Sequence, residues 1–158
     1  MKLYIKQKVF SLGDRYYVFD ENQRPVFTVQ GQIFTIGAKI HIYDITGQEL
    51  YYIERRLFRL LPEYHIFCGD NHCAIVKKEF SLFRPRLAIQ SQYGDYTIEG
   101  SLFGMDFVIY NEGIPVGEVH KKWFAFGDSY ELDVIDPNNA AFFSALVIAI
   151  DNCLHNEN

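Results

Sequence analysis

A repeated pattern of aromatic and aliphatic residues constrains this chain more than any other feature of its sequence. Residues 10–18 and 124–132 share Phe at the first position, an apolar residue at +2, Gly-Asp at +3 and +4, Tyr at +6 and an aliphatic residue at +8. Weaker or shortened copies that keep the apolar positions span residues 34–42, 58–66, 80–89 and 103–109. Such a period indicates that one supersecondary unit recurs along the chain.

The even spacing of the apolar positions predicts that each copy is a β-strand. Successive side chains of a strand point to opposite faces, so the apolar residues of each copy would share one face. Turn sequences such as Thr46-Gly47 fall between the copies, so each unit predicts one β-hairpin. We expect about twelve strands in an antiparallel meander.

The chain changes character over residues 138–154, which contain no Gly or Pro and follow an Asp-Pro pair. We expect a helix there, capped by Asn138 or Asn139. Its segment 140–150 is apolar on every side apart from one Ser, so it must be buried all round or lie in lipid. Eleven residues are too few to cross a bilayer, which needs about 20, so we expect burial in protein and no transmembrane segment.

The helix and the strands together predict a closed barrel. About eight strands make a barrel that its own side chains can fill, so about twelve would leave a lumen for the helix. The helix, at roughly 24 Å, matches strands of roughly 26–30 Å. We therefore expect a mainly β fold: a closed antiparallel barrel around a central hydrophobic helix, formed as a single domain by residues 1–158. Inward Phe, Tyr and aliphatic side chains would pack onto the helix, and closure would remove the exposed sheet edges.

Residues 6–20, residues 120–130 and the apolar C-terminal helix resemble the LURP-one-related family, over essentially the whole chain. This family belongs to the tubby C-terminal-domain-like superfamily, together with the phospholipid scramblases. The resemblance implies a twelve-stranded barrel around a hydrophobic helix. The superfamily includes phosphoinositide binders and proteins linked to lipid scrambling.

Charge and composition exclude several classes of protein. The chain carries 15 basic and 20 acidic residues, a net charge of −5, whereas nucleic-acid binding needs a basic surplus. Its N-terminus alternates apolar and charged residues and lacks the apolar core of a secretion signal, so we expect a cytoplasmic protein. Three Cys are too few for a disulfide scaffold, which fits a reducing compartment.

Positive charge recurs at one position of the repeat, just before the first aromatic residue. All such junctions of a meander barrel lie at the same rim, so we expect a basic collar suited to anionic phospholipid headgroups or another polyanion. The collar consists of Lys6, Lys8, Arg55, Arg56, Lys77, Lys78, Lys121 and Lys122. Trp123 follows the last pair and is a candidate for a lipid interface. The alternative is that these are solvated strand ends, partly neutralised by Glu54, Glu79 and Glu118.

Signals of catalysis are weak, and we expect a protein that is not an enzyme and has no cofactor. Asp14 and Asp128 occupy equivalent repeat positions, as paired catalytic carboxylates could, but a Gly-Asp turn explains each of them. The sequence contains no nucleophile elbow, phosphate-binding loop or His-Glu-x-x-His motif.

The same holds for metal binding. Cys68, His72 and Cys73 flank one turn and offer three ligands, whereas a closed zinc site needs four, so reduced thiols in a hairpin are the simpler interpretation. His41 and His65 share the +7 position of successive copies and are expected on the outer face, as solvent-facing residues or as a metal-binding pair. Cys153 is expected to be buried.

Two functional hypotheses follow. The first is a non-enzymatic binding or scaffold protein, peripheral at the membrane, that binds anionic phospholipid or another polyanion through the basic rim. The second is a protein-interaction module that uses the aromatic outer face of the barrel, for instance Tyr17, Phe19, Tyr43 and Tyr51.

Overall fold

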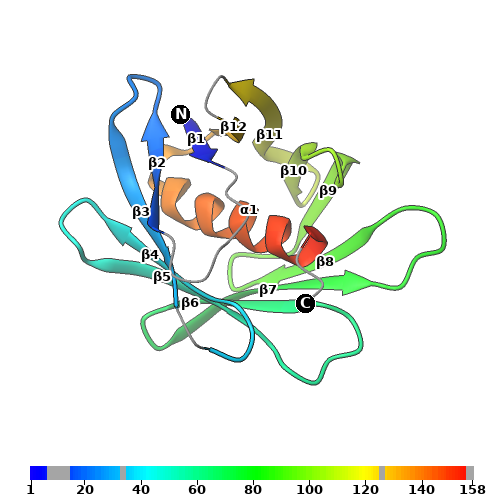
Figure 1. Ribbon diagram of the computed structural model, residues 1–158. Helices are drawn as coiled ribbons and strands as arrows, with labels where there is room; N and C mark the ends of the chain where they lie inside the picture. Colours follow the sequence, from blue (N-terminus) through cyan, green and yellow to red (C-terminus); the bar gives the residue numbers. More distant parts are fainter. Residues whose placement is uncertain (7–14, 33–34, 125–126, 156–158) are drawn as a thin grey trace.

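A computed structural model describes residues 1–6, 15–32, 35–124 and 127–155, with the side chains of all of these except 6, 123, 124, 127 and 128. Twelve antiparallel strands form a closed barrel in which every strand pairs with its neighbours in sequence and β1 pairs with β12 (Figure 1). The strands are β1 (Lys2–Lys6), β2 (Arg15–Asp20), β3 (Pro25–Gly31), β4 (Lys39–Asp44), β5 (Glu49–Arg55), β6 (Glu63–Cys68), β7 (Asn71–Glu79), β8 (Arg86–Ser91), β9 (Tyr96–Ser101), β10 (Asp106–Asn111), β11 (Ile114–Phe124) and β12 (Gly127–Val134). The predicted fold is confirmed.

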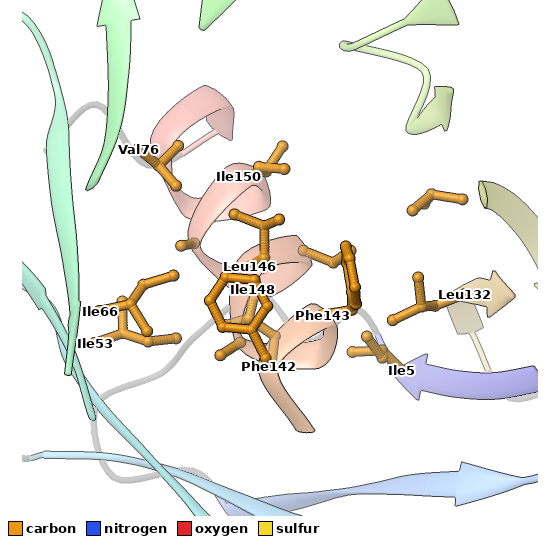
Figure 2. Close-up of a cluster of buried hydrophobic side chains, with 14 of the residues drawn as sticks. Ile5, Ile53, Ile66, Val76, Leu132, Phe142, Phe143, Leu146, Ile148 and Ile150 are labelled. Carbon is orange, nitrogen blue, oxygen red and sulfur yellow. The ribbon is translucent and has the colours of Figure 1, made fainter. Parts of the chain in front are cut away.

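Helix α1 (Ala140–His155) runs through the barrel, with 13 of its 16 residues buried. Figure 2 shows Phe143, Leu146 and Ile150 of the helix among inward side chains of the surrounding strands. The two polar residues buried on the helix bond to its own backbone: Ser144 Oγ donates to the Ala140 carbonyl at 2.8 Å, and Asn152 Nδ2 donates to the Ile148 carbonyl at 2.8 Å. Within the described part of the chain, no helix combines the length and apolar character needed to cross a bilayer.

The helix starts differently from the prediction. A single 3₁₀ turn, η1 (Pro137–Asn139), precedes it, and Asp136 caps this turn by accepting the backbone N–H of Asn138 at 3.0 Å. The N-cap is therefore Asp136 and not an Asn. Pro137 supplies the reason, because a proline favours the first position of a helical turn and leaves the preceding residue as the cap.

The two ends of the barrel differ in the connections that they carry. The turn end holds the connections over residues 21–24, 45–48, 69–70, 92–95, 112–113 and 135–139. The loop end holds the described connections over residues 35–38, 56–62, 80–85 and 102–105. Helix α1 begins at the turn end and finishes at the loop end, where the Cys153 thiol contacts the Pro62 carbonyl at 3.5 Å.

The structure corrects one feature of the repeat. The residues at +6 and +8 face the helix, as Tyr64 and Ile66 of β6 show with exposures of 0%. In the copies over residues 58–66 and 80–89, the initial Phe and the apolar residue at +2 lie instead in loop-end connections, where Phe58 and Leu60 are fully exposed. The copies over residues 58–66 and 80–89 therefore each mark an exposed loop followed by a buried strand, and Phe58 and Phe80 do not pack onto the helix.

Two tyrosines on the inner face allow a matched test of buried polar groups. Among the described residues, the Tyr64 hydroxyl is buried without a hydrogen-bond partner, whereas the Tyr130 hydroxyl donates to Asp151 Oδ1 at 2.7 Å. An unpaired buried hydroxyl is costly, so Tyr64→Phe should raise the free energy of unfolding by about 1 kcal/mol. Tyr130→Phe should lower it by about 1–3 kcal/mol, because a bond to a carboxylate is lost. Urea denaturation measures both, and a loss of stability in Tyr64→Phe would contradict this packing.

Candidate functional site

The basic collar lies at the loop end, as the repeat predicts for the described members. Arg55 closes β5, Lys77 and Lys78 lie near the end of β7, and Lys121 and Lys122 lie in the same half of β11. Arg56 begins the next loop-end connection. Three predictions fall outside the described residues: the whole of Lys8 and the side chains of Lys6 and Trp123. Asp14 and the side chain of Asp128 are outside them as well.

Three members of the collar face the inside of the barrel mouth. Arg55 pairs in register with Tyr64 and Lys121 pairs with Tyr130, so they share the inner face with these buried residues, and Lys78 shares that face with Val76. Burial raises the pKa of the Cys153 thiol to about 11, against the opposing charges of Lys78 and Arg55. These two cations therefore act on the last turn of α1, where positive charge stabilises the negative end of the helix dipole.

The other three members face outward and have acidic neighbours. Arg56 Nη1 lies 2.9 Å from Glu54 Oε1, and Lys122 Nζ lies 3.8 Å from Glu131 Oε1. Lys77 pairs in register with Glu63, whose pKa is lowered by a hydrogen bond from His65 and by the charges of Arg59, His65 and Lys77. The expected neutralisation by Glu54 is seen, and Glu131 and Glu63 contribute to it across strands. Of the described collar members, Arg56 and Lys122 therefore form ion pairs, and Lys77 lies beside a carboxylate.

A larger asymmetry of charge separates the two ends of the barrel. Each turn-end connection has an acidic residue inside it or directly before it: Asp20, Glu21, Asp44, Asp70, Asp95, Glu112 and Asp136. The described loop-end connections contain no Asp or Glu inside them; Glu79 lies directly before one of them, and Glu63 and Asp106 lie directly after two others. Apart from Lys2 and Arg24, every Lys and Arg of the described residues lies in a loop-end connection or in the adjoining half of a strand. The barrel is thus acidic at the turn end and basic at the loop end.

The turn-end acids also stabilise the turns that carry them. Asp20 accepts the backbone N–H groups of Arg24 and Asn22 at 2.9 and 2.8 Å, and these bonds lower the pKa of its carboxyl group. Asp44 accepts the Thr46 hydroxyl at 2.6 Å and the Gln48 N–H at 3.0 Å, with the same effect on its pKa. These carboxylates therefore remain ionised over the physiological pH range.

The loop end also exposes large apolar side chains. Relative exposure reaches 103% for Phe58, 100% for Leu60 and 95% for Phe83, values that leave no packing against the protein. Among the described residues at this end, the exposed large apolar side chains are Ile36, Leu57, Phe58, Leu60, Phe80, Leu82, Phe83 and Phe103. The repeat pattern contains this signal, but its even spacing predicts a buried strand face instead.

Three of the loops follow one another around the loop end. The loop over residues 35–38 contacts the next one, because the Arg55 N–H donates to the Ala38 carbonyl at 2.9 Å and a Cβ at Gly37 would lie 2.9 Å from Leu57 Cδ2. The loop over residues 56–62 is tied to β7 by the Lys78 N–H, which donates to the Pro62 carbonyl at 2.9 Å. The β7–β8 loop, bright green in Figure 1, extends beyond the end of α1. We name residues 35–38, 56–62 and 80–85 the apolar arc.

An open depression of about 580 Å³ lies between the first two loops of the apolar arc. Ile36 and Leu57 supply apolar walls, while Lys39, Arg55 and Arg56 supply cationic ones. Thr35 and Glu54 complete the lining. Mixed apolar and cationic walls suit a ligand that is both anionic and apolar.

The aromatic outer face is less extensive than predicted. Tyr51 pairs in register with the buried Ile42 and its ring lies 6.0 Å from that of Phe142, so it faces the helix and not solvent. Tyr17 and Phe19 do lie together on the wall, with ring centroids 6.1 Å apart. The interaction surface proposed for this face therefore loses Tyr51.

The His and Cys candidates are distributed over opposite faces. Cys73 is buried on the inside, whereas His72 lies on the outer wall with its Nε2 2.9 Å from His65 Nδ1, so they do not converge on one ion. His41 bonds to Gln32 and Glu49. The Tyr52 ring on β5 lies between His41 on β4 and Phe67 on β6, so it separates His41 from His65. Among the described residues, no group of three or more His, Cys, Asp or Glu is arranged to hold a metal ion.

Comparisons with known proteins agree with this architecture. A family model described as LURP-one-related matches residues 1–151. A protein of Bacillus subtilis (strain 168), described as uncharacterized protein YxjI, is 30% identical over 157 residues, which cover 99% of this chain and 96% of the relative. The X-ray structure of a protein from Arabidopsis thaliana has a TM-score of 0.64 at 18% identity, over 95% of this chain and 89% of that one, and shows the shared fold. This chain belongs to the LURP-one-related family.

Proposed function

We propose that the protein is a non-enzymatic binding protein that attaches reversibly to anionic membrane surfaces through its loop end. The observation that carries the proposal is the separation of charge along the barrel. A net charge of −5 would repel an anionic surface if it were spread evenly. With acids at the turn end and cations at the loop end, the field of the membrane attracts one end and repels the other, so it also orients the barrel.

Under this proposal, cations inside the loops contribute more to membrane binding than the collar cations that the sequence predicted. Among the collar cations in strands, Lys122 pairs with Glu131, Lys77 lies opposite Glu63, and Arg55 and Lys78 act on the end of α1. Arg59 and Arg84 lie beyond them, inside the loops of the apolar arc, where Arg59 also pairs with Glu63 at 3.6 Å. Lys39 and Arg86 begin the strands that follow. A planar anionic surface reaches loop residues before strand residues, so the loop cations contribute most to binding.

A matched pair of charge reversals tests the proposal. Arg84→Glu changes an exposed Arg at the loop end, and Arg24→Glu changes an exposed Arg at the turn end, with the same effect on net charge. One basic residue near an anionic surface contributes about 1 kcal/mol, so reversal costs about 2 kcal/mol, or roughly 30-fold in vesicle binding for Arg84→Glu. Arg24→Glu should bind vesicles like the unaltered protein, because Arg24 lies at the turn end, away from the membrane. Its fold should persist, because the surface ion pair between Arg24 and Asp20 contributes little to stability.

The measurement is co-sedimentation with phosphatidylcholine vesicles that contain or lack phosphatidylserine, at low and high salt. We expect binding that needs the anionic lipid and weakens with salt, because ions screen exposed charges. Absence of binding at low salt, or equal losses in the two variants, would refute attachment through the loop end.

A further inference from the structure

We infer that the apolar arc inserts into the bilayer, so that the side chains of Phe58, Leu60, Leu82 and Phe83 enter the hydrocarbon region below the headgroups. This inference rests on the proposed function and adds a mode of binding to it: the partner is the lipid acyl chain as well as the anionic headgroup. The arc then anchors a barrel that charge has already oriented.

The large apolar side chains of the arc are strongly exposed to solvent. Phe58, Leu60 and Phe83 are at least 95% exposed, and Phe80 and Leu82 are exposed by 78% and 77%. A soluble protein seldom exposes a contiguous group of large apolar side chains unless the group contacts a partner. These side chains lie on one rim of the barrel, because the loops that carry them follow one another around the barrel mouth.

The backbone of Phe58 adopts a strained conformation. Phe58 has a φ of +59°, in the left-handed region that bulky residues avoid. Packing of the Phe58 side chain does not offset this strain, because the side chain is fully exposed. Backbone strain that packing does not offset is typical of functional sites. Here the strained conformation holds an aromatic ring away from the protein.

The interleaved charges identify the partner as a bilayer. Arg59 lies between Phe58 and Leu60, Arg84 follows Phe83, and the arc contains no acidic residue. Long cationic side chains reach back to phosphates while neighbouring apolar groups enter the acyl region, as in proteins that lie in a membrane interface. Arg59 Nε lies 3.6 Å from Glu63 Oε2, so this cation is held at the base of its loop.

A native thiol provides the control for a direct test. Cys68 is exposed at the turn end, whereas Cys73 and Cys153 are buried. An NBD fluorophore on Cys68 reports the environment of the turn end, and the same label in Cys68→Ser/Phe83→Cys reports that of the apolar arc. With phosphatidylserine-containing vesicles, we expect emission from position 83 to brighten and shift to shorter wavelength and to be quenched by brominated acyl chains. Emission from Cys68 should not change.

Co-sedimentation of the labelled proteins separates the two proposals. If neither sediments with anionic vesicles at low salt, the proposed function and the insertion both fail. If both sediment while the label at position 83 stays in an aqueous environment, attachment holds and insertion is overturned. Capture of the arc by a protein and not by lipid would give this second result.

Phe58→Gly provides an independent check, because glycine adopts a positive φ without steric cost. We expect vesicle binding to fall roughly fivefold as the apolar ring is lost, while the melting temperature stays unchanged or rises. Binding equal to that of the unaltered protein would overturn a role for Phe58 in insertion.

Discussion

Replacing Leu146 with Asp should leave the chain unable to form its barrel, and Leu146→Ala should lower the free energy of unfolding by about 2–5 kcal/mol. Leu146 lies on the middle turn of α1 with an exposure of 0%, among residues from strands all around the barrel (Figure 2). Truncation leaves a cavity in the centre of the core, and the carboxyl group of Asp would be buried there without a hydrogen-bond partner. Urea denaturation followed by circular dichroism measures both effects.

Leu146→Met is the control, because it conserves volume and should cost less than about 1.5 kcal/mol. His155→Gln at the exposed end of the same helix should also retain the fold. A Leu146→Asp chain that unfolds at the urea concentration of the unaltered protein would contradict a helix enclosed by the barrel.

The second large effect concerns the membrane. Phe58→Asn/Leu60→Ser/Leu82→Ser/Phe83→Ser should lower binding to anionic vesicles by about 100-fold or more. Full burial of each original side chain is worth about 1.5–3 kcal/mol, so partial insertion of four exceeds the roughly 2.7 kcal/mol that corresponds to 100-fold. Asn is chosen at position 58 because it tolerates a positive φ. Thermal stability should not fall, since these side chains are exposed in the free protein.

A matched variant at the other end isolates the role of position. Ile45→Ser/Ile114→Ser/Ile135→Ser removes three exposed aliphatic side chains from the turn end and its adjoining strand residues. It should bind vesicles like the unaltered protein. Similar losses in both variants would mean that general surface hydrophobicity, and not the apolar arc, determines binding.

Much of the fold was predictable because buried strands and a buried helix impose strong periods on the sequence. The +6 and +8 positions of each copy alternate as a half-buried strand requires, and the apolar segment of α1 could only be enclosed. The exposed half of the repeat was not predictable from period alone, since Phe58 and Leu60 have the spacing of a strand face. The positive φ of Phe58 takes the backbone out of the extended conformation of a strand, and the sequence does not show it.

The candidate site was predictable in its place but not in its composition. A meander puts alternate connections at one end, so the position of the collar followed from the repeat. Its ion pairs depend on cross-strand register, which places Glu63 opposite Lys77 and Glu131 near Lys122. The contrast between acidic turns and acid-free loops was present in the sequence and becomes clear once alternate connections are assigned to opposite ends.

Hydrogen exchange of the full chain on phosphatidylserine-containing vesicles tests end-on attachment most directly. Amides of exposed loops exchange rapidly in the free protein and slow down where a membrane covers them. We predict vesicle-dependent protection in residues 56–62 and 80–85, with unchanged exchange in the turn-end connections over residues 45–48, 69–70 and 112–113. Protection of the turn end or of the outer wall, with the two loops still exchanging rapidly on bound protein, would contradict the account.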